Sequence, residues 1–324
     1  MENQKRGLLA RVGHYYYVDN MSQVEIAKRL NIHRSTVSRM LQQARDEGIV
    51  QIKINFSSSN IFDLENYFRN KYGLKDVLIV GNEKSIPSMK EKMFFEEAAY
   101  YLYRIIDRQK MIGITWGSTL GNTIANINWQ KQTQATFVPL VGGPSQIKSE
   151  YHVNSIVHSL SEKFIGKSIF INSTAVQETE NLAQGIIQSK YFKKIYDAWN
   201  NLDLAIVSVG GLIESTESQW RDLLNEDDYR HLREENAIGD CCCRFFDEEG
   251  QEIKGSLNKR TVGITIEQLN HVPEAVVIAY GFSKVKAIHT IIEKKKGINL
   301  VTDFETAIEI LKLDNDKNVD EFIE

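Results

Sequence analysis

The side chains best suited to contacting a polyanion gather in one short stretch, residues 22–45. Arg34 and Arg39 carry guanidinium groups, which can donate two hydrogen bonds to the edge of a guanine, and serine and threonine hydroxyls lie between them. Backbone amides at a helix start also bind phosphate oxygens. The stretch therefore predicts a DNA-contacting surface. Its expected members are Gln23, Arg34, Ser35, Thr36, Ser38 and Arg39.

Two predicted helices joined by a tight turn position this surface. Ser22 and Glu25 have the spacing of a capping box, which predicts that a helix begins after Ser22. The small Ala27 lets two helices approach closely, and Asn31 tolerates the positive φ that a turn requires. The pattern is typical of a helix-turn-helix, whose second helix enters the major groove. The simpler alternative is a helical hairpin with a solvated basic face. Apolar sides of the two helices are expected at Val24, Ile26, Ala27 and Leu30, and at Ile32, Val37, Met40 and Leu41.

Residues on either side of this motif complete a small predicted domain. Apolar residues at helical spacing between residues 4 and 18 predict a preceding helix. Gly48 is expected to end the motif, after which residues 49–54 alternate as in a strand. Such a strand resembles the wing of a winged helix, in which Lys53 would contact a phosphate, and a purely structural strand fits equally well. The polar residues 55–60 predict a domain boundary between residues 56 and 57.

Charge is divided unequally at this boundary. Residues 1–56 hold nine lysines and arginines against five aspartates and glutamates, whereas the whole chain holds 39 against 43. The first segment therefore carries a net charge of +4 and the remainder a net charge of −8. A small basic domain joined to a larger acidic one favours contact with a polyanion through the first alone, although ordinary surface variation gives a similar imbalance.

Composition excludes several other classes of protein. No apolar run approaches the roughly 18 residues that a membrane-spanning helix needs, and the first residues lack the pattern of a signal peptide. Cys241, Cys242 and Cys243 are consecutive, which suits neither a disulfide nor a metal site. We therefore expect a cytoplasmic protein that contacts no membrane and requires no cofactor or metal.

Residues 57–324 alternate apolar strands with helices. This alternation predicts an α/β domain with a doubly wound parallel sheet that is covered on both faces. In such sheets, ligands bind beyond the carboxyl ends of the strands. Strands are expected at residues 76–80, 111–114, 136–140, 168–171, 204–209, 275–279 and 299–302, and helices at residues 89–107 and 303–311.

Glycine-bearing loops follow four of these strands, and together they predict one ligand pocket. Gly117 clears space after the second strand, and Ser118 and Thr119 open a helix whose amides suit an anion. Gly281 follows a later strand and is itself followed by Lys284. The expected ligand-binding residues are Thr115, Trp116, Gly117, Ser118, Thr119, Gly142, Gly143, Pro144, Ser145, His152, Asn154, Gly210, Asp240, Arg244 and Lys284.

Several of these assignments have a structural alternative. Residues 115–119 also fit a simple capped turn, and His152 and Asn154 suit the start of a helix. Asp240 could accept hydrogen bonds from sugar hydroxyls and Arg244 could hold a phosphate. The same two residues also suit a structural ion pair.

Over essentially its whole length, the chain resembles the SorC family of sugar-binding transcriptional regulators. The resemblance rests on the helix-turn-helix at residues 22–45, on GITWGSTL at residues 113–120 and on VPLVGG at residues 138–143. Gly239-Asp240 ahead of Arg244-Phe245 adds to it. The resemblance implies a winged-helix domain, a larger domain related to phosphosugar isomerases, and a homotetramer on operator DNA that is controlled by a sugar or sugar phosphate.

Two further segments, residues 142–154 and 185–192, favour the subgroup that responds to L-sorbose or a related ketose. The resemblance assigns residues 117–119 and Lys284 to the effector phosphate, and places Asp240 and Arg244 beside the pocket. Some family members have a lysine before the Gly-Gly pair, which binds the effector covalently, and others have an arginine there. Here the position is Val141, so we expect non-covalent binding and disfavour a bisphosphate.

The favoured function is an effector-controlled regulator of a sugar-utilisation operon, without enzymatic activity. A sugar-phosphate isomerase-like enzyme is the alternative, with Asp240 and His152 as candidate acid and base. However, the sequence shows no recognisable set of nucleophile and base. In addition, an isomerase does not require a basic helix-turn-helix for its reaction. A structural DNA-binding protein without a ligand is the third hypothesis.

Overall fold

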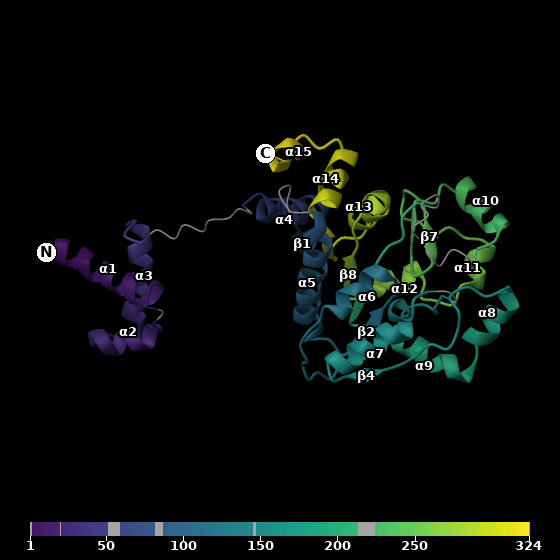
Figure 1. The fold of residues 1–324 in the computed structure, drawn as a ribbon, viewed down its shortest axis with the longest axis horizontal. Coiled ribbons are helices and arrows are strands. Elements are labelled where there is room, and N and C mark those ends of the chain that lie inside the picture. Colours follow the sequence, from purple (N-terminus) through teal and green to yellow (C-terminus); the bar gives the residue numbers. More distant parts are fainter. Residues whose placement is uncertain are drawn as a thin grey trace. The chain divides into compact units, whose positions relative to one another are not determined.

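The chain consists of two compact units, Met1–Ser57 and Ser58–Glu324 (Figure 1). The computed structural model describes residues 2–19, 21–50, 59–81, 87–144, 147–212 and 224–323. The predicted domain boundary, most of the predicted wing strand and Lys53 lie outside these residues. Within the described part of the chain, no helix is long and apolar enough to cross a membrane.

The small unit consists of α1 (Glu2–Tyr17), α2 (Gln23–Leu30) and α3 (Arg34–Asp46). The predicted capping box is present, because the Glu25 amide donates to Ser22 Oγ and the Ser22 amide donates to Glu25 Oε2. Asn31 ends α2 with the predicted positive φ, 51°. After α3, Ile49 and Val50 form a bend. These local signals fix the angle at which α3 leaves the turn.

The core of the small unit is formed mainly by Val12, Ile26, Ala27, Val37 and Leu41, which are buried. The prediction that Val24 belongs to this core is wrong, because its side chain is 47% exposed. Ile26, Ala27 and Leu30 share one side of α2, whereas a residue two positions before Ile26 lies about 200° around the helix. The core therefore holds one face of α2 and α3 and leaves the other face to solvent.

The large unit contains a sheet of seven parallel strands, which confirms the predicted doubly wound α/β architecture. From β2 the chain proceeds outward to β3 and β4, then crosses to the other side of β2 to form β5 and the strands beyond it. The switch point therefore lies between β2 and β5. The order across the sheet is β1 (Asp76–Val80), β9 (Asn299–Asp303), β8 (Glu274–Ile278), β5 (Leu204–Val207), β2 (Met111–Ile114), β3 (Thr136–Pro139) and β4 (Lys167–Ser168).

Alternate residues of each strand enter the cores on opposite faces of the sheet. Leu204 and Ile206 of β5 pack with α5 (Pro87–Ile106), α6 (Ser118–Ala125) and α7 (Val153–Lys163). Ala205 and Val207 pack into the other core. The elements of that face include α4 (Ser59–Tyr72), α9 (Lys190–Trp199), α12 (Ile266–His271), α13 (Val285–Lys294), α14 (Phe304–Leu313) and α15 (Val319–Ile323).

Shorter elements complete the large unit, and one strand differs from its prediction. The helices α8 (Glu180–Ile187), α10 (Glu226–Glu234) and α11 (Ser256–Arg260) and the 3-10 helices η1 (Ser149–Tyr151) and η3 (Phe282–Lys284) lie in its connections. The strand expected at residues 168–171 ends at Ser168. The Ile171 amide instead donates to Asn154 Oδ1 at 3.1 Å, and Asn154 Nδ2 donates to the Ile171 carbonyl at 2.9 Å.

An antiparallel hairpin, β6 (Gly239–Cys241) and β7 (Arg244–Phe246), was not predicted. Its two turn residues, Cys242 and Cys243, have φ values of 57° and 59°. A two-residue hairpin turn of this kind usually contains asparagine, aspartate or glycine. Cysteines therefore gave no turn signal in the sequence.

Candidate functional site

The first site is the exposed face of α3. Arg34, Ser35, Ser38 and Arg39 are exposed, and Thr36 and Gln23 are partly buried. In the part of the small unit that the structure describes, neither Arg34 nor Arg39 forms an ion pair. The N-terminal half of α3 thus presents two guanidinium groups and several hydroxyls to solvent. DNA contact by these residues stays a prediction.

Two further cations of the small unit are held by tyrosines of α1. The Arg29 guanidinium lies 4.5 Å from the centre of the Tyr15 ring. Arg45 donates to the Tyr17 hydroxyl, at 3.1 Å, and to Gln42, at 2.6 Å. These contacts limit the conformations of both arginine side chains and keep their charges at the edge of the helix-turn-helix.

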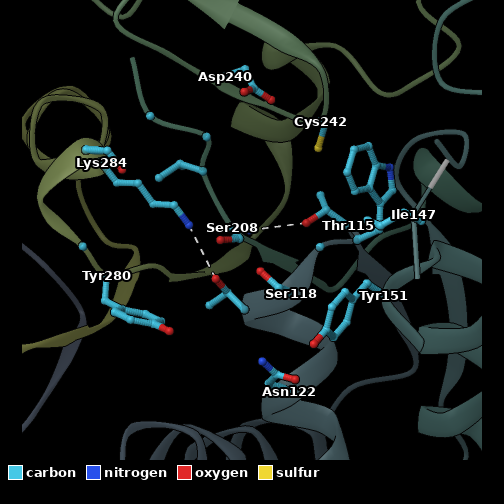
Figure 2. A pocket seen from close by; sticks show the side chains of 18 of the residues that line it. Thr115, Ser118, Asn122, Ile147, Tyr151, Ser208, Asp240, Cys242, Tyr280 and Lys284 are labelled. Atoms are coloured by element: carbon cyan, nitrogen blue, oxygen red, sulfur yellow. Dashed lines mark hydrogen bonds between the residues drawn. The ribbon is translucent and has the colours of Figure 1, made fainter. Parts of the chain in front are cut away.

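The second site is a cavity of about 550 Å³ beyond the carboxyl ends of β2, β5 and β8, at the switch point (Figure 2). Thr115, buried at the end of β2, accepts a hydrogen bond from the Ser208 amide at 3.4 Å. Gly117 has a φ of 123°, which disfavours any other residue, and the chain then enters α6 at Ser118. The first turn of α6 therefore opens into the cavity.

Lys284 brings a positive charge to this helix start. Its ammonium group lies 3.5 Å from Thr119 Oγ1, although the two residues are 165 positions apart in the chain. The helix dipole and the ammonium group both favour an anion here. Ser118 adds a hydroxyl at the same place (Figure 2).

The hairpin closes the opposite side of the cavity with Asp240, Cys242 and Cys243 (Figure 2). Asp240 is 5% exposed, and the Gly210 amide donates to its carbonyl at 2.8 Å. A Cβ atom at position 210 would lie 2.0 Å from Asp240 Oδ1, so any larger residue there would displace the carboxylate. Burial raises the pKa of the Cys242 and Cys243 thiols, which keeps them neutral at pH 7. The Asp240 carboxyl group supplies the side-chain oxygen acceptors of this wall.

Eight of the predicted ligand-binding residues line this cavity, where contact with a ligand stays a prediction. They come from the chain segments that follow β2 and β5, from the hairpin and from the 3-10 helix η3. They are Thr115, Trp116, Gly117, Ser118, Thr119, Gly210, Asp240 and Lys284.

The structure places Arg244 elsewhere. It is 6% exposed, does not line the cavity and donates to four backbone carbonyl groups, those of Asn258, Thr261, Gly263 and Ile264. Its ion-pair partner is Glu252, at 3.4 Å, instead of Asp240. A guanidinium group with these partners holds the chain after β7 together and has no donors directed at a ligand in the cavity.

The loop after β3 also has a structural role. Cβ atoms at Gly142 and Gly143 would lie 2.4 Å from the Thr174 carbonyl and 2.0 Å from His152 Nε2, so these glycines make room for neighbouring chain segments. His152 caps α7, with Nδ1 accepting from the Asn154 amide at 3.2 Å. Burial lowers the pKa of His152 and so preserves this neutral acceptor. Neither these residues nor Pro144 and Asn154 line the cavity, and Ser145 lies outside the described residues.

Several cavity residues were missed from the sequence. Asn122 lies one helical turn after Ser118, so the helical period could have identified it. Tyr151 fits against Gly121, where a Cβ atom would lie 2.5 Å from its ring. Glu91 and Tyr280, joined by a 3.2 Å hydrogen bond, come from α5 and from beyond β8 and had no local signal. The other missed lining residues are Ile147, Lys148, Ser208, Val209, Cys242 and Cys243. Val141, Gly211, Gly281 and Ser283 also line the cavity and lie in the glycine-bearing loops that were predicted to form it.

Known proteins match both units. The family model described as "Putative sugar-binding domain" matches residues 57–312, and a Crp-like helix-turn-helix model matches residues 5–65. The sorbitol operon regulator of Klebsiella pneumoniae is 28% identical over 307 residues, which cover 94% of this chain and 98% of that protein. The deoxyribonucleoside regulator of Bacillus subtilis is 25% identical over 95% of this chain and 98% of its own.

Solved structures agree with these matches. The crystal structure of the full-length sorbitol operon regulator SorC from Klebsiella pneumoniae has a TM-score of 0.74, with 28% identity over 94% of this chain and 98% of that one. A transcriptional regulator from Streptococcus pneumoniae TIGR4 has a TM-score of 0.75, with 37% identity over 80% of this chain and 99% of that one.

Proposed function

This chain belongs to the SorC family of sugar-binding transcriptional regulators, and from that membership we propose how its two units act. Residues 1–56 bind operator DNA through α3, with Arg34 and Arg39 on base edges or phosphates. Residues 57–324 bind a sugar or sugar phosphate in the cavity beyond β2, β5 and β8. Occupancy of the cavity favours one arrangement of the protein over another and so changes operator affinity.

The observation that carries this proposal is the arrangement of charge across the cavity. Lys284, Thr119 and the start of α6 form a cationic, hydroxyl-bearing end, and the Asp240 carboxylate lies on the opposite side. A phosphorylated sugar matches both ends, because its phosphate suits the cation and helix start and its hydroxyls can donate to a carboxylate. Asn122 and Glu91 offer further hydrogen-bonding groups to hydroxyls.

The residue at position 141 favours a non-covalently bound monophosphate or free sugar as the effector. Val141 lines the cavity and has no amine that could form an imine with a carbonyl carbon. It also supplies no charge for a second phosphate. We propose L-sorbose, a related ketose or its monophosphate as the effector, on the sequence of the segments at residues 142–154 and 185–192.

A regulator is favoured over an isomerase by the position of His152. The two residues that could have formed an acid–base pair are separated, since Asp240 lines the cavity and His152 caps α7. The similar proteins are named as regulators. One helix-turn-helix contacts a single half-site, so we propose that the large unit assembles a homotetramer, which raises operator affinity by presenting several copies at once.

A gel-shift titration of the full-length protein on its operator tests the proposal. L-Sorbose, L-sorbose 1-phosphate and fructose phosphates are added in turn, and we expect one of them to change operator affinity at least fivefold. Lys284→Met should raise the concentration of a phosphorylated effector required by about tenfold or more and affect a free sugar little. Lys286→Met is the matched control, because that lysine lies two residues later on α13, is exposed and pairs with Glu248.

Two outcomes would contradict the proposal. Operator affinity that ignores every sugar tested would leave a constitutive DNA-binding protein. Turnover of a sugar phosphate by the purified protein would instead favour the isomerase-like enzyme.

A further inference from the structure

A second cavity, of about 220 Å³, lies against the face of the sheet that carries α12 and α13. Its floor is formed by Ala205 and Val207 of β5 and by Ala275 and Val277 of β8. These positions alternate along each strand and share one face. Because two of the four are alanines, their small side chains do not fill the layer between the sheet and the helices, and space remains there.

The walls of this cavity are largely apolar. Leu269 and Ile266 of α12 form one wall, Ile291 of α13 forms another, and Cys241 and Phe246 close it from the hairpin. The rim carries the exposed residues Glu249, Gln251, Asn270 and Lys294. A ligand could therefore enter from solvent and bury an apolar body.

One charged group projects into this apolar space. Lys295, which lies just after α13, is partly buried, and its ammonium group donates to the Leu269 carbonyl at 2.6 Å. Across the described ranges of the chain, no carboxylate lies within ion-pairing distance of it, whereas Lys294 pairs with Glu293 at 3.3 Å. An ammonium group has three donors, and burial lowers the pKa of Lys295 because the site disfavours an uncompensated charge. An incoming anion would supply the missing partner.

We propose that the second cavity is a binding site for a small amphiphilic carboxylic acid. The apolar body lies over Ala205 and Ala275, and the carboxylate binds Lys295. Size agrees with this class, since an apolar cavity of about 150 Å³ can hold benzene. A cavity of 220 Å³ has room for one ring or a six-carbon chain together with its carboxylate.

The second cavity is separate from the cavity at the switch point, and no residue lines both. The two are nevertheless connected by the hairpin and by α13. Along β6, Asp240 faces the first cavity and Cys241 the second. Helix α13 follows Lys284 and ends beside Lys295. A bound acid would therefore contact elements that also shape the effector cavity.

Saturation-transfer difference NMR on the full-length protein tests the site, with benzoate and hexanoate as probes and benzyl alcohol as an uncharged analogue. We expect benzoate to bind, and Lys295→Met to weaken benzoate by at least tenfold while leaving benzyl alcohol nearly unchanged. Lys296→Met is the matched control, because the adjacent exposed lysine does not line the cavity. Ala275→Leu should abolish binding of benzoate and hexanoate, because the larger side chain would fill the cavity from the sheet.

Three results would overturn the proposal. These are no benzoate binding to the unmodified protein, equal benzoate affinity in Lys295→Met and Lys296→Met, or undiminished binding in a folded variant whose cavity is filled. Because Ala275→Leu changes a sheet residue, Ile291→Phe provides a second way to fill the cavity from a helix. None of these measurements requires DNA or a sugar, so they stand apart from the test of regulation.

Discussion

The exposed face of α3 and the cavity beyond β2, β5 and β8 differ in how far their site residues also hold the fold together. Arg34, Ser35 and Arg39 are exposed on α3, whereas Val37 and Leu41 of the same helix are buried in the core. In the cavity, Thr119 and Asp240 are 6% and 5% exposed. In an amphipathic helix, the residues that bind a partner can lie on one face and the residues that pack into the core on another. The residues that line a cavity at a sheet edge are themselves packed into the fold.

This difference predicts that function and stability separate in the small unit and change together in the large one. The free energy of unfolding of the large unit can be followed by tryptophan fluorescence, because all four tryptophans of the sequence lie beyond residue 57. Three substitutions test the comparison, in order of their expected effect on the stability of the unit in which each lies.

Arg244→Met should have the largest effect. Removing the buried guanidinium group takes the buried charged partner from Glu252 and a donor from each of four carbonyl groups, which we expect to cost about 3–5 kcal/mol of unfolding free energy in urea denaturation. Lys254→Met is the control, because Lys254 pairs with the same Glu252 but is 72% exposed, and it should change stability by less than about 0.5 kcal/mol. If Arg244→Met left stability unchanged and weakened effector binding, Arg244 would be a ligand-binding residue, as the sequence predicts.

Gly210→Ala should have an intermediate effect and alter binding as well. The new Cβ atom would displace the Asp240 carboxylate, and overpacking of this kind costs about 1–3 kcal/mol. Effector affinity, measured by calorimetry, should fall in the same variant. In Gly185→Ala, where nothing lies within 4 Å of the new atom on helix α8, we expect a gain of about 1 kcal/mol and unchanged binding. Equal stability of the two variants would show that Gly210 is not required for packing.

Arg34→Ala should leave stability within about 0.5 kcal/mol of the unmodified protein, as judged by circular dichroism. Operator binding should weaken by about 1–3 kcal/mol, and binding to random DNA by less, if the guanidinium group contacts a base. Arg11→Ala, an exposed change on α1, is the control. Equal losses on operator and random DNA would limit Arg34 to a phosphate contact.

The sequence alone determined the features that depend on neighbouring residues. The capping box at Ser22, the left-handed Asn31 and the alternation of apolar strands with helices involve hydrogen bonds or periods spanning a few positions. The loop at residues 115–119 was found in the same way, because a glycine and two hydroxyl residues between a strand and a helix are visible locally. These signals were sufficient for the fold class and for one wall of the cavity.

Only the tertiary structure decided which polar residues face the cavity and which hold the chain together. Asp240 and Arg244 are four residues apart on one hairpin, yet Asp240 lines the cavity and Arg244 bonds Glu252 and the carbonyl groups that follow β7. Their roles depend on which segments pack against each side of the hairpin. Likewise, Lys284 approaches Thr119 across 165 residues because β2 and β8 flank β5 in the sheet. Local sequence carries no record of such distances, since the order of strands in a sheet is fixed by packing of the whole domain.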